Sequence, residues 1–397
     1  MKTLILYSSY LGTRKASYYS DWLDAFVRCN YFDITALNIV PSFLKVPNSS
    51  KYQNPRDLHL SRHTTAYQLL YQSYTFFYRR LLPAFIKHHL LPSMRRMREW
   101  DLIILLHSTN ANSMLALSSI ESYLKSRKGK LLIFVGNEYC LMPEKIRFIK
   151  NVEADYVASQ LPEKAAKWLY EDCTHSRIVL VPHGLNSKIY KPLRDPLSRR
   201  VDIGFIGDRY SLAVGDIERT KLAEYFSQND FWPGMTKDIR IGRKLRLPRE
   251  EYARFLNTIR GTIGGESGTY YLEKTDKTQK EIEAFLSYHP KATFDDIYNR
   301  FLTNYSNPVS GKAISSRHFE AAGTKTCQIL LEGEYNGIFK PDVHYICLKK
   351  DYSNIDDVIA RFRDNRYLQT MVNETYEYVM ENHTYERRVV DIWEVVS

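Results

Sequence analysis

The sequence predicts an α/β protein made of two doubly wound domains that face each other across a cleft. Short apolar runs alternate with longer stretches in which apolar residues recur three and four positions apart. Strands that alternate with helices in this way build parallel sheets from right-handed β–α–β units. A segment rich in proline divides the runs into two series, and the 397 residues are enough for two or three separate cores.

The first series is expected to form one parallel sheet. Its apolar runs cover residues 3–8, 33–39, 102–106, 130–135, 156–158 and 177–181. The opening run, from Met1 to Tyr7, carries one cation and is too short for a secretory signal, so we expect a buried strand there. The second series predicts a second sheet from residues 202–206, 238–241, 261–264, 328–331 and 345–348.

The boundary between the domains falls within residues 181–200, where three prolines and one glycine interrupt a polar stretch. The sequence predicts an N-terminal Rossmann-like domain over residues 1–185, a hinge linker over 186–200, a second Rossmann-like domain over 201–380, and a terminal helix over 381–397 that packs back towards the first domain. Ligands of such sheets bind beyond the carboxyl ends of the strands. We therefore expect the active site in the cleft between the two domains.

Positive charge is concentrated in one segment of the chain. The net charge is +11, and residues 51–100 contribute +7 of it, with nine Lys and Arg residues against two acidic ones. The segment also carries aromatic residues at helical spacing, namely Tyr67, Tyr71, Tyr74, Tyr78 and Phe85. Such a helix packs on its own domain with a solvated basic face, lies on an anionic membrane, or binds nucleic acid. No nucleic-acid-binding motif accompanies it, which argues against the third interpretation.

The chain lacks the motifs of several classes of enzyme. There is no HExxH and no Asp-x-Asp pair, so we expect neither a metal site nor a metal requirement. Walker A, Gly-x-Gly-x-x-Gly and Gly-x-Ser-x-Gly sequences are also absent, which argues against nucleotide hydrolases, dinucleotide enzymes and serine hydrolases. The five scattered cysteines include no CxxC pair and indicate reduced thiols in a cytosolic protein.

The stretch from residue 315 to residue 331 carries the strongest local signal. Serine begins an expected helix, Gly323 ends it, and a buried strand follows. Arg317 and Glu320 lie three positions apart and therefore on one helical face. They form either a surface ion pair or a binding site, in which the helix N-terminus holds a phosphate and Glu320 accepts hydrogen bonds from ribose hydroxyls.

The order of these features resembles the GT-B glycosyltransferases. It resembles more closely the group 1, family 4-like transferases related to spore-maturation glycosyltransferases. The segments that carry the resemblance are 137–145, 181–186, 202–219, 317–341 and 383–387. The resemblance spans about residues 100–397, and it implies that the N-terminal domain holds the acceptor and the second domain holds the nucleotide-sugar donor.

The resemblance implies three catalytic candidates. His107 stands at the end of a strand, where the family has a histidine that faces the transferred sugar; a structural histidine is the alternative. Glu266 lies where the family's first glutamate loop begins, with residues 269–314 as an insertion; an exposed acid in a glycine-rich turn is the alternative. Glu138 is expected to contact the acceptor or to act as a base.

The expected donor-binding residues surround the departing nucleoside diphosphate. Without a metal, cations and backbone amides must stabilise its charge. The resemblance implies that Glu320 binds the donor ribose, whereas Lys312 stands where the family usually has another glutamate. The full expected set is Gly12, Gly207, Arg209, Lys312, Ser316, Arg317, Glu320 and Thr324.

The resemblance thus implies a glycosyltransferase of the hexosyltransferase type, active in bacterial surface polysaccharide synthesis. It would move a sugar from a UDP- or GDP-linked donor to a glycan or polyprenyl-linked acceptor, with no cofactor. It would work in the cytoplasm, peripherally on the inner face of the membrane, with residues 51–100 against anionic lipid. Two alternatives stay open on the sequence: a GT-B sugar-nucleotide epimerase, and a non-enzymatic basic domain that binds nucleic acid or an anionic polymer.

Overall fold

The structure of the protein is a computed structural model. It describes every residue of the chain except 10–16, 40–83, 85–87, 89–95, 243–244 and 307–308. Gly12 and most of the basic segment 51–100 therefore lie outside the described residues.

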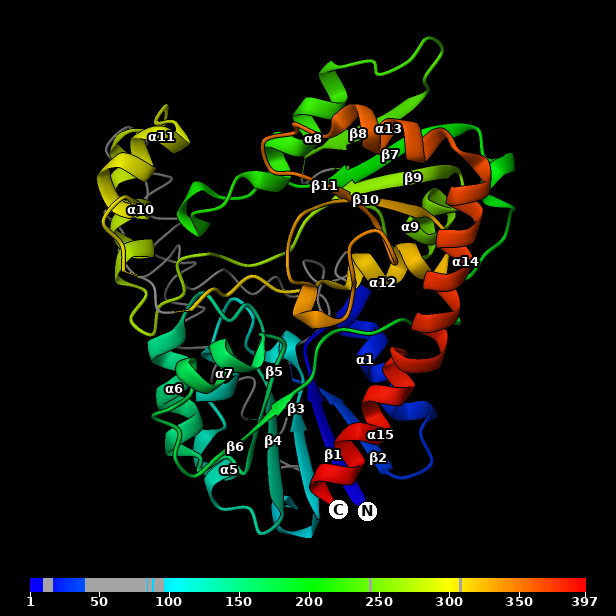
Figure 1. Ribbon diagram of the computed structural model, residues 1–397. Helices are drawn as coiled ribbons and strands as arrows, with labels where there is room; N and C mark the ends of the chain where they lie inside the picture. The colour runs from blue at the N-terminus through cyan, green and yellow to red at the C-terminus, as the bar shows by residue number, and fades with distance from the viewer. Residues whose placement is uncertain (10–16, 40–83, 85–87, 89–95, 243–244, 307–308) are drawn as a thin grey trace, which may run out of the picture.

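The N-terminal domain is built on a six-stranded parallel sheet with the order β2-β1-β3-β4-β5-β6 (Figure 1). The strands are β1 (Lys2–Tyr7), β2 (Asp33–Asn38), β3 (Leu102–Leu105), β4 (Lys130–Phe134), β5 (Tyr156–Ser159) and β6 (Arg177–Leu180). Ile5 of β1 and Ile104 of β3 lie opposite each other and are fully buried. This continuous burial is typical of a parallel sheet that is covered on both faces.

Short helices connect these strands. They are α1 (Ser17–Arg28), η5 (Met97–Glu99), η6 (His107–Thr109), α4 (Leu115–Ser118), α5 (Glu121–Lys125), α6 (Met142–Asn151) and α7 (Glu163–Leu169). Apolar side chains from α1 and from the C-terminal helix form the core on one face of the sheet. The α4–α7 region forms the core on the other face.

The C-terminal domain is built on a five-stranded parallel sheet with the order β11-β10-β9-β7-β8. Its strands are β7 (Val201–Gly207), β8 (Lys237–Ile241), β9 (Ile259–Gly264), β10 (Cys327–Leu331) and β11 (Ile346–Leu348). Its helices are η7 (Pro196–Ser198), η8 (Leu212–Val214), α8 (Glu218–Gln228), α9 (Arg249–Leu256), α12 (Ser316–Gly323), η11 (Tyr335–Gly337), α13 (Ile355–Arg363) and α14 (Asn365–Asn382).

The predicted fold class is confirmed, because the chain forms two α/β domains on separate parallel sheets. Every apolar run that was expected to form a strand does so, and the strand ends lie within two residues of the expected ones. Figure 1 shows the two sheets on either side of the region where α1 and α12 approach each other.

The chain crosses between the domains twice at one place. The first crossing follows β6, and the second joins α14 to α15 (Tyr385–Val396), which packs on α1 of the N-terminal domain. Leu185 N–H donates to the carbonyl of His383 over 2.8 Å, and Tyr385 N–H donates to Leu185 over 3.0 Å. A Cβ on Gly184 would lie 2.9 Å from the nitrogen of Tyr385, so the close approach of the two crossings requires glycine there.

An additional helical segment stands between β9 and α12 and contains α10 (Lys277–Tyr288), α11 (Phe294–Ile297) and η10 (Tyr298–Leu302). We call residues 269–314 the insertion. Leu272 and Val309, near its two ends, belong to the apolar core of the N-terminal domain. The insertion therefore extends from the C-terminal domain and packs on the N-terminal domain. Among the described residues, no helix combines the length and the apolar character that a membrane crossing requires.

Candidate active site

Helix α12 begins at the carboxyl edge of the second sheet, and its N-terminus is well defined. Ser315 is the N-cap residue, and its side chain and that of His318 complete a capping box. Arg317, in the first turn, donates a hydrogen bond from Nη1 to the carbonyl of Ile206 over 3.0 Å. The same guanidinium nitrogen lies 3.3 Å from the point where a Cβ on Gly207 would stand. Gly207 thus leaves room for Arg317 beside the end of β7.

Two further arginines accompany Arg317. The guanidinium of Arg219, on α8, lies 3.9 Å above the ring of Tyr210. Burial lowers the pKa of Arg219, and the positive charges of Arg317 and Arg246 act in the same direction. Arg246 lies 3.7 Å from Asp208. Three guanidinium groups therefore gather where β7 ends, and arginine is the side chain best suited to bind a diphosphate through paired hydrogen bonds.

Two other expected phosphate ligands have partners within the protein. Arg209 is exposed and forms an ion pair with Glu224 over 2.9 Å. Lys312 is buried, and its Nζ lies 2.6 Å from Asp216 and 3.4 Å from Glu218. Burial disfavours the charged form of Lys312. The attraction of the two carboxylates outweighs this effect and raises the pKa of Lys312 above the usual range. The charge of Lys312 is therefore neutralised inside the domain.

Glu266 lies under the turn that follows β10. Its Oε1 accepts a hydrogen bond from the backbone N–H of Tyr335 over 2.8 Å, and burial raises the pKa of its carboxyl group. A Cβ on Gly333 would lie 2.6 Å from Oε2. Only 9% of Glu266 is exposed, which contradicts the alternative of an exposed acid in a turn.

Glu320 and Thr324 occupy the middle and the end of α12. Glu320 is 3% exposed, so it is not part of a surface ion pair, and its charge helps to raise the pKa of Asp21 on α1. Thr324 is fully buried, and its hydroxyl contacts the carbonyls of Glu320 and Ala321 at 3.2 and 3.0 Å. Ser316 is also buried, at the opposite end of the helix from Thr324.

His107 lies in an aromatic environment at the end of β3. It is fully buried among the rings of Tyr18, Trp22, Phe134 and His183, with ring centroids 5.0 to 6.1 Å away. Neither of its ring nitrogens has a hydrogen-bond partner among the described residues. Burial lowers the pKa of His107 well below its usual value, so the ring is neutral. A neutral imidazole donates one hydrogen bond and accepts another, so the two nitrogens can serve a ligand only when the rings that enclose His107 move apart.

Glu138, the third catalytic candidate, is held by the N-terminal domain. Its Oε1 accepts hydrogen bonds from Ser159 over 2.6 Å and from Tyr170 over 2.7 Å, and its Oε2 accepts from the N–H of Gln160 over 2.9 Å. Burial raises the pKa of Glu138. These bonds fix the loop between β4 and α6 rather than directing the carboxylate at a ligand.

Residues of the two domains influence each other's pKa values where the domains face each other. Burial raises the pKa of Tyr139, in the N-terminal domain, while the charge of Arg219 lowers it, and Tyr210 also acts on it. Burial lowers the pKa of His183 to about 3, and the charge of His318 on α12 contributes. The structure thus brings His183 of the first domain close to His318 of the second, and Tyr139 close to Arg219.

Sequence reasoning gave no role to several residues that lie where the two domains meet. Arg219 and Tyr139 lie in segments that carried the family resemblance, so the signal was present without an assignment. Arg246 lies in a connection without a motif, and only the folded chain places it near Arg219. Within the described part of the chain, no group of three or more His, Cys, Asp or Glu side chains is placed to hold a metal ion.

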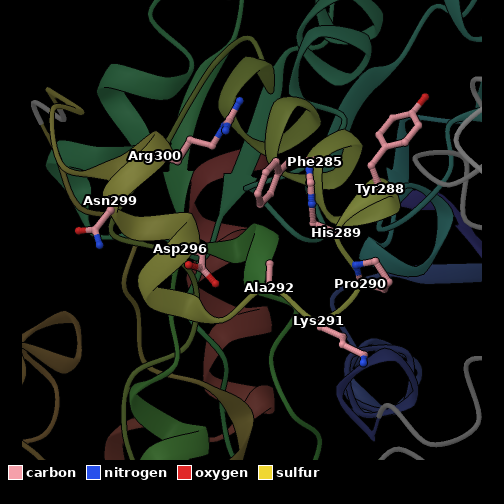
Figure 2. Close-up of a pocket in the computed structure, with 9 residues that line it drawn as sticks. All are labelled: Phe285, Tyr288, His289, Pro290, Lys291, Ala292, Asp296, Asn299 and Arg300. Carbon is pink, nitrogen blue, oxygen red and sulfur yellow. The ribbon is translucent and has the colours of Figure 1, made fainter.

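A separate groove of about 770 Å³ lies in the insertion, between α10 and the α11–η10 segment (Figure 2). The ring of Phe285 lies 4.3 Å from that of His289, tilted by 32°, and 4.8 Å from the guanidinium of Arg300. The residues that line the groove are Phe285, Tyr288, His289, Pro290, Lys291, Ala292, Asp296, Asn299 and Arg300. All of them belong to the insertion, so the groove is distinct from the strand ends that form the candidate site.

A family model described as glycosyl transferase-like matches residues 240–394. No curated protein matches the chain. Among solved structures, a UDP-forming α,α-trehalose-phosphate synthase from Burkholderia vietnamiensis is similar, with a TM-score of 0.50 and 14% identity over 100% of this chain and 99% of that one. Anabaena HepE in complex with UDP and glucose has a TM-score of 0.47 and 10% identity over 100% and 99% of the two chains.

T4 phage β-glucosyltransferase has a TM-score of 0.48 and 10% identity over 100% of this chain and 98% of that one. At 14% identity, the similarity to the trehalose-phosphate synthase indicates a shared fold and says nothing about the substrate. The protein therefore has the GT-B fold of two facing α/β domains, and its residues 240–394 match a glycosyl transferase-like domain.

Proposed function

We propose that the protein is a glycosyltransferase that moves a sugar from a nucleotide-sugar donor to a glycan or lipid-linked glycan. The observation that carries the proposal is the gathering of Arg219, Arg246 and Arg317 at the end of β7, beside the N-terminus of α12. A diphosphate placed there would meet three guanidinium groups and the positive end of a helix dipole.

The proposed mechanism follows from the charge that develops during transfer. The bond from the sugar to the diphosphate breaks, and negative charge accumulates on the departing phosphate while the sugar becomes oxocarbenium-like. Arg219 and Arg317 stabilise that negative charge from fixed positions. His107, neutral and on the opposite domain, hydrogen-bonds a hydroxyl of the transferred sugar. Glu320 binds the ribose, and Glu266 holds the Tyr335 turn at the edge of the site.

The finer parts of the proposal concern substrates and place. We propose a UDP- or GDP-linked hexose as the donor, no divalent metal, and a polyprenyl-linked or polymeric acceptor in bacterial surface polysaccharide synthesis. Kinship with spore-maturation glycosyltransferases, and a cytoplasmic location with the basic segment 51–100 on an anionic membrane face, complete the proposal. These parts rest on the sequence resemblance and on the concentration of charge in that segment.

Thermal unfolding in the presence of nucleoside diphosphates tests the proposal. We expect UDP or GDP at millimolar concentration, with EDTA present, to raise Tm by several degrees, because a ligand at 100 times its Kd contributes about 2.7 kcal/mol. Arg219→Ala combined with Arg317→Ala should abolish the shift. Arg387→Ala, at an exposed position of α15, should retain it. If no nucleoside diphosphate raises Tm of the wild type, the proposal is wrong.

A further inference from the structure

Helix α6 begins without a capping side chain of its own. Leu141 occupies its N-cap position with a φ of 57°, and no side chain at that position accepts a hydrogen bond. Helices usually begin with Ser, Thr, Asp or Asn, because the first backbone N–H groups need an acceptor. The amide of Met142, at the first position of α6, therefore needs a partner from elsewhere in the chain.

The partner is Asp276 of the insertion. Its Oδ1 and Oδ2 lie 3.2 and 3.1 Å from the nitrogen of Met142, across 134 positions of sequence. Asp276 is only 3% exposed. The carboxylate thus caps a helix of the N-terminal domain from the segment that follows β9 of the C-terminal domain.

Asp276 does not cap the helix that it begins. It is the N-cap residue of α10 with a φ of 55°, yet its side chain accepts no hydrogen bond from α10. Glu273 serves α10 instead, because it accepts from the N–H of Thr278 at 3.0 Å and from the Thr278 hydroxyl at 2.7 Å. The insertion therefore carries two carboxylates at one helix start, and one of them is directed at the other domain.

The capped end of α6 leads directly into a loop of the candidate site. We call residues 136–141 the β4–α6 loop. Lys145, buried in α6, donates to the carbonyl of Asn137 over 3.0 Å and also contacts that of Gly136 over 2.5 Å. Tyr139 of this loop lines a small cavity together with Val214 and Tyr271, beside the segment that leads to Arg219. The cap and the lysine thus hold the two ends of the loop that presents Tyr139.

The insertion is anchored on the N-terminal domain beside this cap. Lys274 pairs with Glu171 and lies 3.5 Å from Asp172, and its Nζ lies 5.3 Å from the ring of Trp168. Leu272 is fully buried in the core of that domain. These contacts place Asp276 at the start of α6 in the domain arrangement of this structure.

We propose that Asp276 is a positioning residue, which caps helix α6 across the domain boundary and thereby holds the β4–α6 loop, with Tyr139, against the phosphate-binding arginines. The cap forms only while the insertion is docked on the N-terminal domain, so it couples the arrangement of the domains to the shape of the loop. The part of this inference that concerns phosphate binding rests on the proposed function.

Hydrogen exchange of the full chain tests the cap. We expect Asp276→Gly to speed exchange of a peptide covering 136–146 by about fivefold, the factor that a helix cap of ordinary strength is worth. Glycine tolerates a φ of 55°, so backbone strain does not confound the result. Asp276→Asn keeps a neutral acceptor and should give a smaller effect. Unchanged exchange in Asp276→Gly would overturn the cap.

Glu273→Gln is the matched control, because it weakens the start of α10 without touching Met142. It should speed exchange over 277–283 and leave 136–146 as in the wild type. Titration calorimetry with UDP and with GDP then tests positioning. The wild type and Glu273→Gln should bind one of them equally, and Asp276→Gly about fivefold more weakly.

The results of the two experiments separate the cap, its positioning role and the proposed function. Faster loop exchange in Asp276→Gly with unchanged nucleotide affinity would leave the cap in place and overturn its positioning role. Failure of the wild type to bind either nucleotide would overturn the proposed function, and with it the positioning role. Exchange over 136–146 would still decide whether the cap exists.

Discussion

The Nη1 atom of Arg249, on α9, lies 2.9 Å from Oδ1 of Asp21, on α1, so an ion pair joins the two sheets' domains at this point. The same nitrogen lies 2.7 Å from Oδ2 of Asp24. Asn186, at the first crossing of the chain, donates to the same oxygen of Asp21 over 2.7 Å. Both domains and the segment that connects them therefore meet at one nearly buried carboxylate.

Arg249→Ala is expected to lower the free energy of unfolding by about 3 kcal/mol, since it leaves two neighbouring carboxylates without their shared cation. Urea denaturation measures the change. Arg240→Ala removes an exposed pair with Asp238 and should cost under about 1 kcal/mol. If the two substitutions lowered the free energy of unfolding equally, the pair between the domains would stabilise the protein no more than an exposed pair does.

The stability of the protein should depend on pH through Asp21. Burial raises the pKa of Asp21 to about 7, against the opposing hydrogen bonds from Asn186 and Arg249, whereas its ordinary value is 3.8. Between pH 3.8 and pH 7, Asp21 is therefore protonated in the folded protein and ionised in the unfolded chain. This group therefore lowers the free energy of unfolding as pH rises from about 4 to 7, by at most about 1.4 kcal/mol per pH unit.

Asp21→Asn removes that contribution. Urea denaturation at several pH values should give the variant a stability that falls less, or rises more, between pH 4 and 7 than that of the wild type. Above pH 7 the difference between the two proteins should stay constant. Parallel curves through the whole window would contradict the raised pKa of Asp21.

Gly184→Ala should destabilise the protein by about 3 kcal/mol, because its Cβ would lie 2.9 Å from the nitrogen of Tyr385 and 3.0 Å from the carbonyl oxygen of His383. Gly234→Ala is a suitable comparison, since no atom lies within 4 Å of its Cβ and only its φ of 79° opposes the substitution. That strain costs about 1 kcal/mol. Thermal or urea unfolding distinguishes the two values, and a larger loss at Gly234 would refute the close approach of the two crossings.

His107→Leu separates stability from activity. Two buried nitrogens without partners among the described residues are replaced by apolar atoms, so we expect unchanged or higher stability, by up to about 1 kcal/mol. Transfer should nevertheless fall by at least about tenfold if His107 hydrogen-bonds the sugar in the transition state. Unfolding in urea and steady-state kinetics with the donor found by thermal shift measure the two effects. A variant that is both less stable and fully active would assign His107 to the core alone.

The sequence was a good guide to features that depend on short stretches. The eleven strands of the described residues could be predicted because each is a short apolar run between turn residues. Helix α12 could be predicted because Ser315 and Gly323 stand at its ends, and the structure confirms both.

The features that could not be predicted depend on residues far apart in the chain. Lys312 was expected to bind phosphate, but folding places it 2.6 Å from Asp216, which stands 96 positions earlier. No local pattern distinguishes a lysine that faces a ligand from one that is neutralised inside a domain. The partnership of Asp276 with Met142 is equally remote, and sequence alone would assign Asp276 to the helix that it begins.

The position of α15 has a consequence for the order in which the protein folds during synthesis. Tyr385, Val389 and Ile392 complete the apolar core that begins with Ile5 and Trp22. A ribosome delivers Ile5 long before these residues, so the N-terminal domain stays without one wall of its core until α15 has been synthesised. The nascent first domain must expose that apolar face while the second domain forms. The domain that is synthesised first is therefore the last to be completed.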